Sequence, residues 1–289
     1  MTASVEYRWR AKDGLKLFAR DYPGSSGALP VICIPGLTRN SRDFEELAPR
    51  IVDASGRRVL AVDLRGRGAS EFDVNAKNYA PATYASDVLG LMAELRVPKA
   101  VFIGTSLGGF VTITLAAKRI SAIAAAVLND IGPRVEKAGL ERITSYVGKS
   151  PTIRTWADAA RYARETNGAA FPEYGDDDWD RFARRIFNLG PDGAPAPSYD
   201  RNIFRPVSPL QAMLAGPLVW GAYRRLARHR PVLVIRGQTS DILSETTLRK
   251  MERGATAFSC VSVPNVGHAP SLTEPASWEA IRTFLAARP

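Results

Sequence analysis

Apolar, strand-like runs alternate along the chain with segments of helical period, and this alternation restricts the fold more than any other feature. The apolar runs lie at residues 31–36, 58–64, 100–105, 122–130, 231–237 and 258–265. Strands separated by amphipathic helices pair in parallel through right-handed crossovers. The two opening runs, VEYRWRA and LKLFARDY, have no helix between them and predict an antiparallel hairpin at the sheet edge. We therefore expect an α/β fold with a mostly parallel sheet flanked by helices.

The rhythm breaks after Asp130, where about a hundred residues pass before the next core strand. This stretch holds three tryptophans and a Pro- and Gly-rich segment, LGPDGAPAP. Long insertions in compact domains are often functional and cover a site. We predict a core made of residues 1–130 and 231–289, with residues 131–230 forming a mostly helical cap.

Composition and charge exclude several classes of protein. The formal net charge is +10, but the chain has no run of five like charges and no nucleic-acid-binding motif, so we expect no nucleic-acid partner. No apolar stretch approaches the ~18 residues of a membrane span, and no signal-peptide pattern opens the sequence. We expect a cytoplasmic protein, monomeric or homodimeric, with buried, reduced thiols at Cys33 and Cys260.

Neither a metal nor a nucleotide cofactor is expected. The run GDDDWD, residues 175–180, has no histidine nearby and is interpreted as a solvated acidic turn. No G-x-G-x-x-G pattern follows the first strand of a βαβ unit.

The segment GTSLGG places Ser106 between a predicted strand and a predicted helix, in a G-x-S-x-G pattern. The glycines relieve crowding, so that a serine can occupy a strained turn with its hydroxyl exposed. Ser106 is therefore a candidate nucleophile, although a serine in this position could also simply cap the helix.

A serine nucleophile needs a base at the same edge of the sheet, and the chain has two histidines. His229 directly precedes a predicted strand, which places it at the opposite edge, on the surface. His268 follows the last strand in the loop NVGHAP and lies at the edge where a serine at a strand's C-terminal end is found. We predict that His268 is the base.

Two carboxylates could orient the imidazole and stabilise its charged form. Asp241 follows the strand VLVIRG through the short segment QTS, between Ser106 and His268 in the sequence. Asp130 ends the strand AVLND and is the alternative. The order Ser, Asp, His and the loop after the strand favour Asp241, and we interpret Asp130 as stabilising the entrance of the insertion.

Backbone N–H groups usually hold the oxyanion that forms when serine attacks a carbonyl. Leu107, directly after Ser106, supplies one by its position at the helix start. The turn PGLT after the strand VICI nominates the N–H of Leu37 as the second, since Gly36 lets the backbone approach closely.

With these motifs in place, the chain resembles the α/β-hydrolase superfamily, and in particular its small capped esterases, enol-lactonases and C–C hydrolases. The resemblance covers nearly the whole chain through the segments IPGLTRNSRDF, VDLRGRGAS, GTSLGG, GQTSD and NVGHAP. It implies the α/β-hydrolase fold, a mostly structural role for VDLRGRGAS and no cofactor. The chain departs from many members in having Pro35 before Gly36 where they have histidine, so substrate preference does not transfer.

The predicted function is a cofactor-independent serine hydrolase that acts on a small, largely apolar carbonyl substrate: a carboxylic ester, thioester or lactone. Apolar residues of the cap, with Phe72 and Phe110, suggest this apolar site, although packing of the cap would explain them equally well. One alternative is a C–C bond hydrolase of the meta-cleavage-product type. Another is a non-catalytic small-molecule receptor on the same fold, which would not turn over a simple ester. Dehalogenation or epoxide opening, which resemblance assigns to an aspartate nucleophile, is disfavoured by the serine at position 106.

Overall fold

The computed structural model describes residues 2–149, 152–203 and 209–288. Its main sheet has eight strands in the order β1-β2-β4-β3-β5-β6-β9-β10. These strands are β1 (Val5–Arg10), β2 (Lys16–Tyr22), β3 (Val31–Ile34), β4 (Val59–Asp63), β5 (Ala100–Thr105), β6 (Ile123–Asn129), β9 (Val232–Gly237) and β10 (Phe258–Val263). Within this sheet, all neighbouring strands in the order β4-β3-β5-β6-β9-β10 pair in parallel. The opening hairpin β1–β2 is antiparallel and joins β4 at the edge, as predicted.

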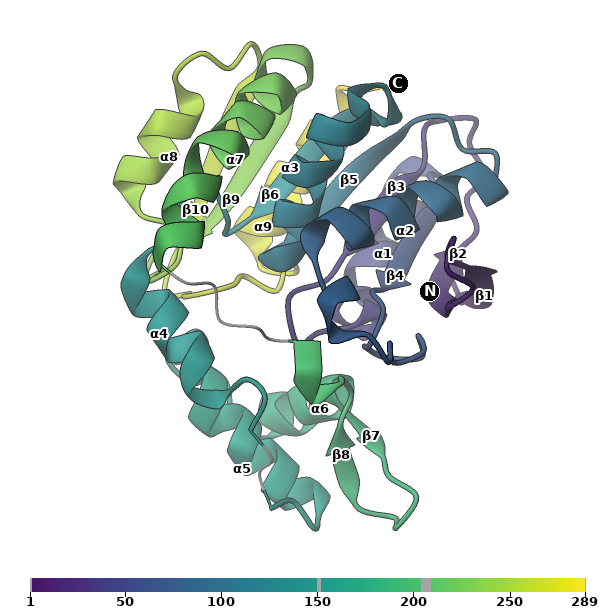
Figure 1. The fold of residues 1–289 in the computed structure, drawn as a ribbon, viewed down its shortest axis with the longest axis vertical. Helices are drawn as coiled ribbons and strands as arrows, with labels where there is room; N and C mark the ends of the chain where they lie inside the picture. The colour runs from purple at the N-terminus through teal and green to yellow at the C-terminus, as the bar shows by residue number, and fades with distance from the viewer. Residues whose placement is uncertain (1, 150–151, 204–208, 289) are drawn as a thin grey trace.

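Helices cover both faces of this sheet and produce three layers (Figure 1). On one face lie α2 (Pro81–Glu94), α3 (Leu107–Arg119), α7 (Pro209–His229) and α8 (Glu245–Glu252); on the other lie α1 (Leu47–Ser55) and α9 (Pro275–Ala286). The four central strands β3, β4, β5 and β6 are almost wholly buried, because both of their faces are covered by helices. This is the architecture that the resemblance to α/β-hydrolases implies.

A separate lobe extends below the sheet in Figure 1. It contains α4 (Lys137–Tyr146), α5 (Trp156–Asn167), α6 (Asp176–Ile186) and the small antiparallel pair β7 (Phe187–Leu189) and β8 (Pro195–Pro197). We call these elements the cap lobe. It has its own apolar core, built around Phe171, Trp179, Phe182 and Phe187. The lobe is the helical insertion expected after β6.

The predicted cap range also includes α7, which packs on the sheet. Tyr223 and Leu226 of α7 are buried in the same apolar cluster as residues of α3. Residues 150–151 and 204–208 of the predicted range lie outside the described residues. His229, at the end of α7, is exposed and directly precedes β9, where the sequence places it.

We expected the acidic run 175–180 to form a turn, but it forms the start of helix α6. Asp176, Asp177 and Asp178 occupy its first turn, and the Asp178 carboxylate accepts the N–H of Gly175 at 3.0 Å. Negative charge is stabilising at a helix N-terminus because the free N–H groups carry partial positive charge. Among the residues described, no group of three His, Cys, Asp or Glu side chains could hold a metal ion. In the same part of the chain, no helix is long and apolar enough to cross a membrane.

Candidate active site

Ser106 occupies a strained turn between the end of β5 and the start of α3. Its backbone has φ 51° and ψ −113°, a conformation that costs a non-glycine residue about 1–3 kcal/mol. The turn is tight enough to require glycine on both sides. A Cβ on Gly104 would lie 2.4 Å from the Gly108 carbonyl carbon, and one on Gly108 would lie 2.0 Å from the Ile34 oxygen. The G-x-S-x-G pattern is thus required by close backbone packing around the strained serine.

The side chains of Ser106, His268 and Asp130 form one hydrogen-bonded chain. The Ser106 Oγ and His268 Nε2 atoms are 2.8 Å apart, and His268 Nδ1 lies 2.8 Å from Asp130 Oδ2. Asp130 follows β6 and is fully buried, while the His268 side chain is almost so. The sequence-predicted pair of Ser106 and His268 is therefore brought together, with a carboxylate on the far side of the imidazole.

Asp130 has three hydrogen-bond partners, as a buried carboxylate requires. Besides His268, its Oδ1 accepts the Gly237 N–H at 3.0 Å, and its Oδ2 accepts the Ser240 hydroxyl at 2.6 Å. Gly237, at the end of β9, and Ser240, in the loop that follows, therefore hold the Asp130 carboxylate beside His268.

Asp241 does not contact His268, and we correct the expected partner of His268 from Asp241 to Asp130. The Asp241 carboxylate instead forms a two-point ion pair with Arg142 of α4, at 2.6 and 2.9 Å. The Arg142 guanidinium holds the pKa of Asp241 below its ordinary value. In the loop after β9, Ser240 faces the buried carboxylate, whereas the next residue, Asp241, binds the cap lobe.

The predicted oxyanion donors lie beside Ser106. Leu107 is the first residue of α3, so its N–H has no acceptor within the helix. Leu37 follows β3 and lines the same pocket as Ser106. The fully buried Arg67 donates from Nε to the Leu37 carbonyl at 2.9 Å and so fixes this turn. The donor role of both N–H groups stays a prediction.

The segment VDLRGRGAS is tied into the core. The Arg65 guanidinium pairs with the carboxylates of Asp13, Asp73 and Asp87. Asp63 accepts the N–H groups of Ser41 and Ala69. Neither Arg65 nor Asp63 lines the pocket at Ser106.

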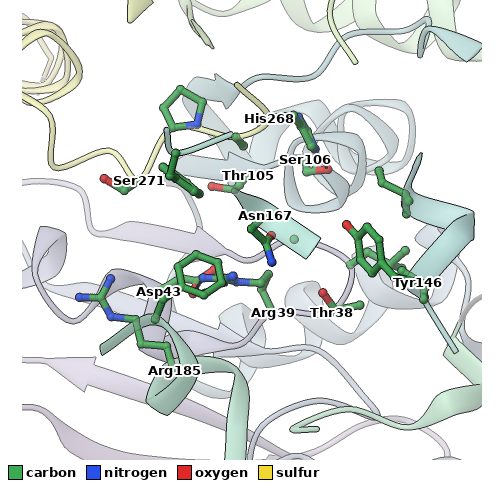
Figure 2. A pocket seen from close by; sticks show the side chains of 18 of the residues that line it. Thr38, Arg39, Asp43, Thr105, Ser106, Tyr146, Asn167, Arg185, His268 and Ser271 are labelled. Carbon is green, nitrogen blue, oxygen red and sulfur yellow. Dashed lines mark hydrogen bonds and ion pairs between the residues drawn. The ribbon is translucent and has the colours of Figure 1, made fainter. Parts of the chain in front are cut away.

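The pocket at Ser106 lies between the sheet edge and the cap lobe (Figure 2). The core contributes Thr38, Arg39 and Asp43, and the lobe contributes Ile143, Tyr146, Asn167, Phe171, Tyr174, Phe182 and Arg185. Burial raises the pKa of the Tyr146 and Tyr174 hydroxyls, so both stay neutral donors. The lobe side of the pocket is thus rich in aromatic residues, and the core side carries the ion pair of Arg39 and Asp43.

Sequence reasoning missed most of these lining residues. Phe72 is exposed, and neither Phe72 nor Phe110 lines the pocket. The expectation of a largely apolar site did not include two arginines and an aspartate. One signal was present in the sequence, because Arg39 follows the turn PGLT directly. The lobe residues carry no such signal, since their positions depend on how α4–α6 fold.

We predict that Ser240→Ala lowers kcat/KM about tenfold. The change removes a hydrogen bond to a buried carboxylate, worth about 1.5–3 kcal/mol, while the contacts of Asp130 with His268 and Gly237 remain. Ser240→Thr keeps a hydroxyl and serves as the control. Unchanged kinetics in the alanine variant would show that this hydroxyl does not support the carboxylate during turnover.

Comparison with known proteins finds relatives that match most of the chain. A family model described as "Alpha/beta hydrolase family" matches residues 31–280. A 3-hydroxybutyrate-oligomer hydrolase of Cupriavidus necator is 34% identical over 253 residues, covering 85% of this chain and 84% of that protein. A 2-(acetamidomethylene)succinate hydrolase of Mesorhizobium japonicum is 29% identical over 81% of this chain and 79% of its own length. The crystal structure of an alpha/beta hydrolase from Novosphingobium aromaticivorans has a TM-score of 0.90 and 42% identity, covering 99% of both chains.

Proposed function

Because the chain belongs to the alpha/beta hydrolase family, we propose that it is a serine hydrolase that cleaves carboxylic esters through an acyl-enzyme. In this proposal Ser106 is the nucleophile, His268 is the general base and acid, and Asp130 orients the imidazole. The observation that carries it is the continuous contact from the Ser106 hydroxyl through His268 to a buried carboxylate.

The reaction follows from these contacts. His268 Nε2 accepts the Ser106 proton as Oγ attacks the carbonyl carbon, and the Asp130 carboxylate stabilises the resulting imidazolium. The N–H groups of Leu37 and Leu107 would bind the oxyanion. The imidazolium then gives its proton to the departing alcohol oxygen, which leaves an ester on Ser106. A water molecule activated by the same imidazole hydrolyses that ester and restores the free serine.

Oligomers of 3-hydroxybutyrate are the first natural substrates to test, since a relative that matches most of the chain is a 3-hydroxybutyrate-oligomer hydrolase. Their units are joined by ester bonds, the type of bond that the proposed mechanism cleaves. Lactones, thioesters and ring-cleavage products belong in the same panel, because the alternatives drawn from the sequence differ in the bond that they cleave.

The direct test is labelling of the intact protein with a fluorophosphonate, followed by peptide mapping. We expect one adduct, on Ser106, and a burst of 4-nitrophenol from 4-nitrophenyl butyrate before the steady state. A protein that binds these compounds without labelling or turnover would instead be a receptor on this fold. A label on any other residue would show that the nucleophile is misassigned.

A further inference from the structure

Arg39 holds a fixed position in the pocket, close to the proposed nucleophile. It ends the turn that begins at Gly36, and a Cβ built on Gly36 would lie 3.3 Å from Arg39 Cγ and 3.8 Å from Ser106 Cβ. The guanidinium carbon of Arg39 lies 4.1 Å from the centre of the Phe182 ring in the cap lobe. Stacking on an aromatic ring fixes the plane of a guanidinium group. Figure 2 shows Arg39 beside Asp43, in the same pocket as Ser106.

Only one edge of this guanidinium is occupied. Arg39 Nε lies 2.8 Å from Asp43 Oδ2, and Nη2 lies 2.6 Å from Asp43 Oδ1. Asp43 therefore binds the side edge of the guanidinium, which is formed by Nε and one N–H of Nη2. Nη1 donates no hydrogen bond to any residue in the described ranges, and it belongs to a side chain that is 19% exposed. The end edge, formed by Nη1 and the second N–H of Nη2, is therefore available to a ligand. A guanidinium fork of this kind matches a carboxylate.

The charges around the two neighbouring cavities favour an anion at Arg39. Besides His268, the charged side chains of the Ser106 pocket are Arg39, Asp43 and Arg185. Arg39 is paired with Asp43, and Arg185 is paired with Glu46. The adjoining cavity, which shares Phe171, Tyr174, Phe182, Arg185 and Ser271 with this pocket, has four acidic and two basic side chains: Glu46, Glu173, Asp178, Glu274, Arg181 and Arg185. The excess of acidic side chains disfavours an anion in this outer cavity, whereas in the Ser106 pocket the end edge of Arg39 can still donate to an anion.

We propose that the free edge of Arg39 binds a carboxylate on the substrate, so that the enzyme prefers esters of carboxylate-bearing compounds. This inference rests on the proposed serine hydrolase and names the substrate class of the same pocket. Asp43 does not prevent the binding, because its two oxygens are taken up by the opposite edge of the guanidinium. Its role is to hold the fork in place.

The test compares esters that differ only in this charge. One pair is the 3-hydroxybutyrate dimer and its C-terminal amide, with the carboxylate on the alcohol side of the scissile bond. The other is mono-4-nitrophenyl glutarate and the corresponding glutaramate, with the carboxylate on the acyl side. We expect kcat/KM to be at least tenfold higher for the acid in one of the pairs, since a charge-assisted bond is about twice as strong as a neutral one.

The double variant Arg39→Met/Asp43→Asn removes the fork without leaving a buried charge unpaired, and it should lose this preference. Arg181→Met, which removes a positive charge from the outer cavity, should keep it. Should the double variant fail to fold, inhibition of the wild type by glutarate and by glutaramide gives a second measure, with glutarate expected to bind at least tenfold more tightly.

Equal rates for acid and amide in both pairs, or a preference that survives in the double variant, would overturn the role of Arg39 and leave the serine hydrolase standing. Hydrolysis that persists at full rate in Ser106→Ala would instead refute the proposed function. The two failures are therefore distinguishable in the same set of assays.

Discussion

Ser106→Ala is expected to lower kcat for ester hydrolysis by about 10⁵- to 10⁶-fold and to abolish fluorophosphonate labelling. In the proposed mechanism Ser106, His268 and Asp130 act as a unit, so removing the nucleophile abolishes almost all of the chemistry that depends on it. The residual rate comes from binding and from the oxyanion donors alone. Steady-state kinetics on 4-nitrophenyl butyrate, with the labelling reaction run beside it, measure both effects.

Because the backbone of Ser106 is strained, alanine and glycine at this position form a matched pair of variants that separates activity from stability. Ser106→Ala keeps the Cβ and the strain, so its melting temperature should stay near that of the wild type. Ser106→Gly removes a side chain from a residue with φ 51°, and we expect the protein to be about 1 kcal/mol more stable. Activity that survives in both variants would exclude Ser106 as the nucleophile.

Much of the fold could be predicted because hydrophobic burial dictates it. The strands β3, β4, β5 and β6 are covered on both faces and appear in the sequence as continuous apolar runs. The edge strand β10 is more exposed, and Cys260 within it is exposed as well, contrary to the expectation that both thiols are buried. Its apolar run has the composition of a central strand, and only the position in the sheet decides how much of it is covered.

The cap lobe was predictable as an insertion but not in its detail. Helix α6 begins with three aspartates that composition alone assigns to a turn, yet the same charges stabilise a helix N-terminus. The apolar stripe of Trp179, Phe182 and Ala183 buries against the lobe core. Which lobe residues reach the Ser106 pocket depends on the packing of α4–α6, and no local pattern encodes that packing.

Sequence alone could not choose between Asp130 and Asp241. Strands β6 and β9 are neighbours in the sheet, with Asn129 opposite Ile235, so the loops after both strands meet at one edge. Chain order is therefore compatible with either carboxylate beside His268. The direction of each side chain decides the matter: Asp130 points to His268, whereas Asp241 points to Arg142.

Asp130→Asn is expected to lower kcat by about 10⁴-fold. The Asp130 carboxylate accepts hydrogen bonds from the Gly237 N–H and the Ser240 hydroxyl as well as from His268. With Gly237 N–H bound to the amide oxygen, the asparagine must present its NH₂ group to His268 Nδ1. That nitrogen must then accept, which moves the imidazole proton to Nε2. An Nε2–H cannot take the proton of Ser106, so the base is lost although the geometry is kept.

Asp241→Asn should lower kcat by less than about tenfold, because its carboxylate binds Arg142 on α4 and does not touch His268. The asparagine keeps one oxygen for the guanidinium, and an ion pair that is about a third exposed contributes roughly 0–1 kcal/mol. Kinetics of the two variants on one substrate, with melting temperatures measured alongside, form a matched experiment. A silent Asp241→Asn beside an active Asp130→Asn would mean that the acid in turnover differs from the carboxylate bound to His268 here. The loop after β9 would then have to exchange Arg142 for His268 during the reaction.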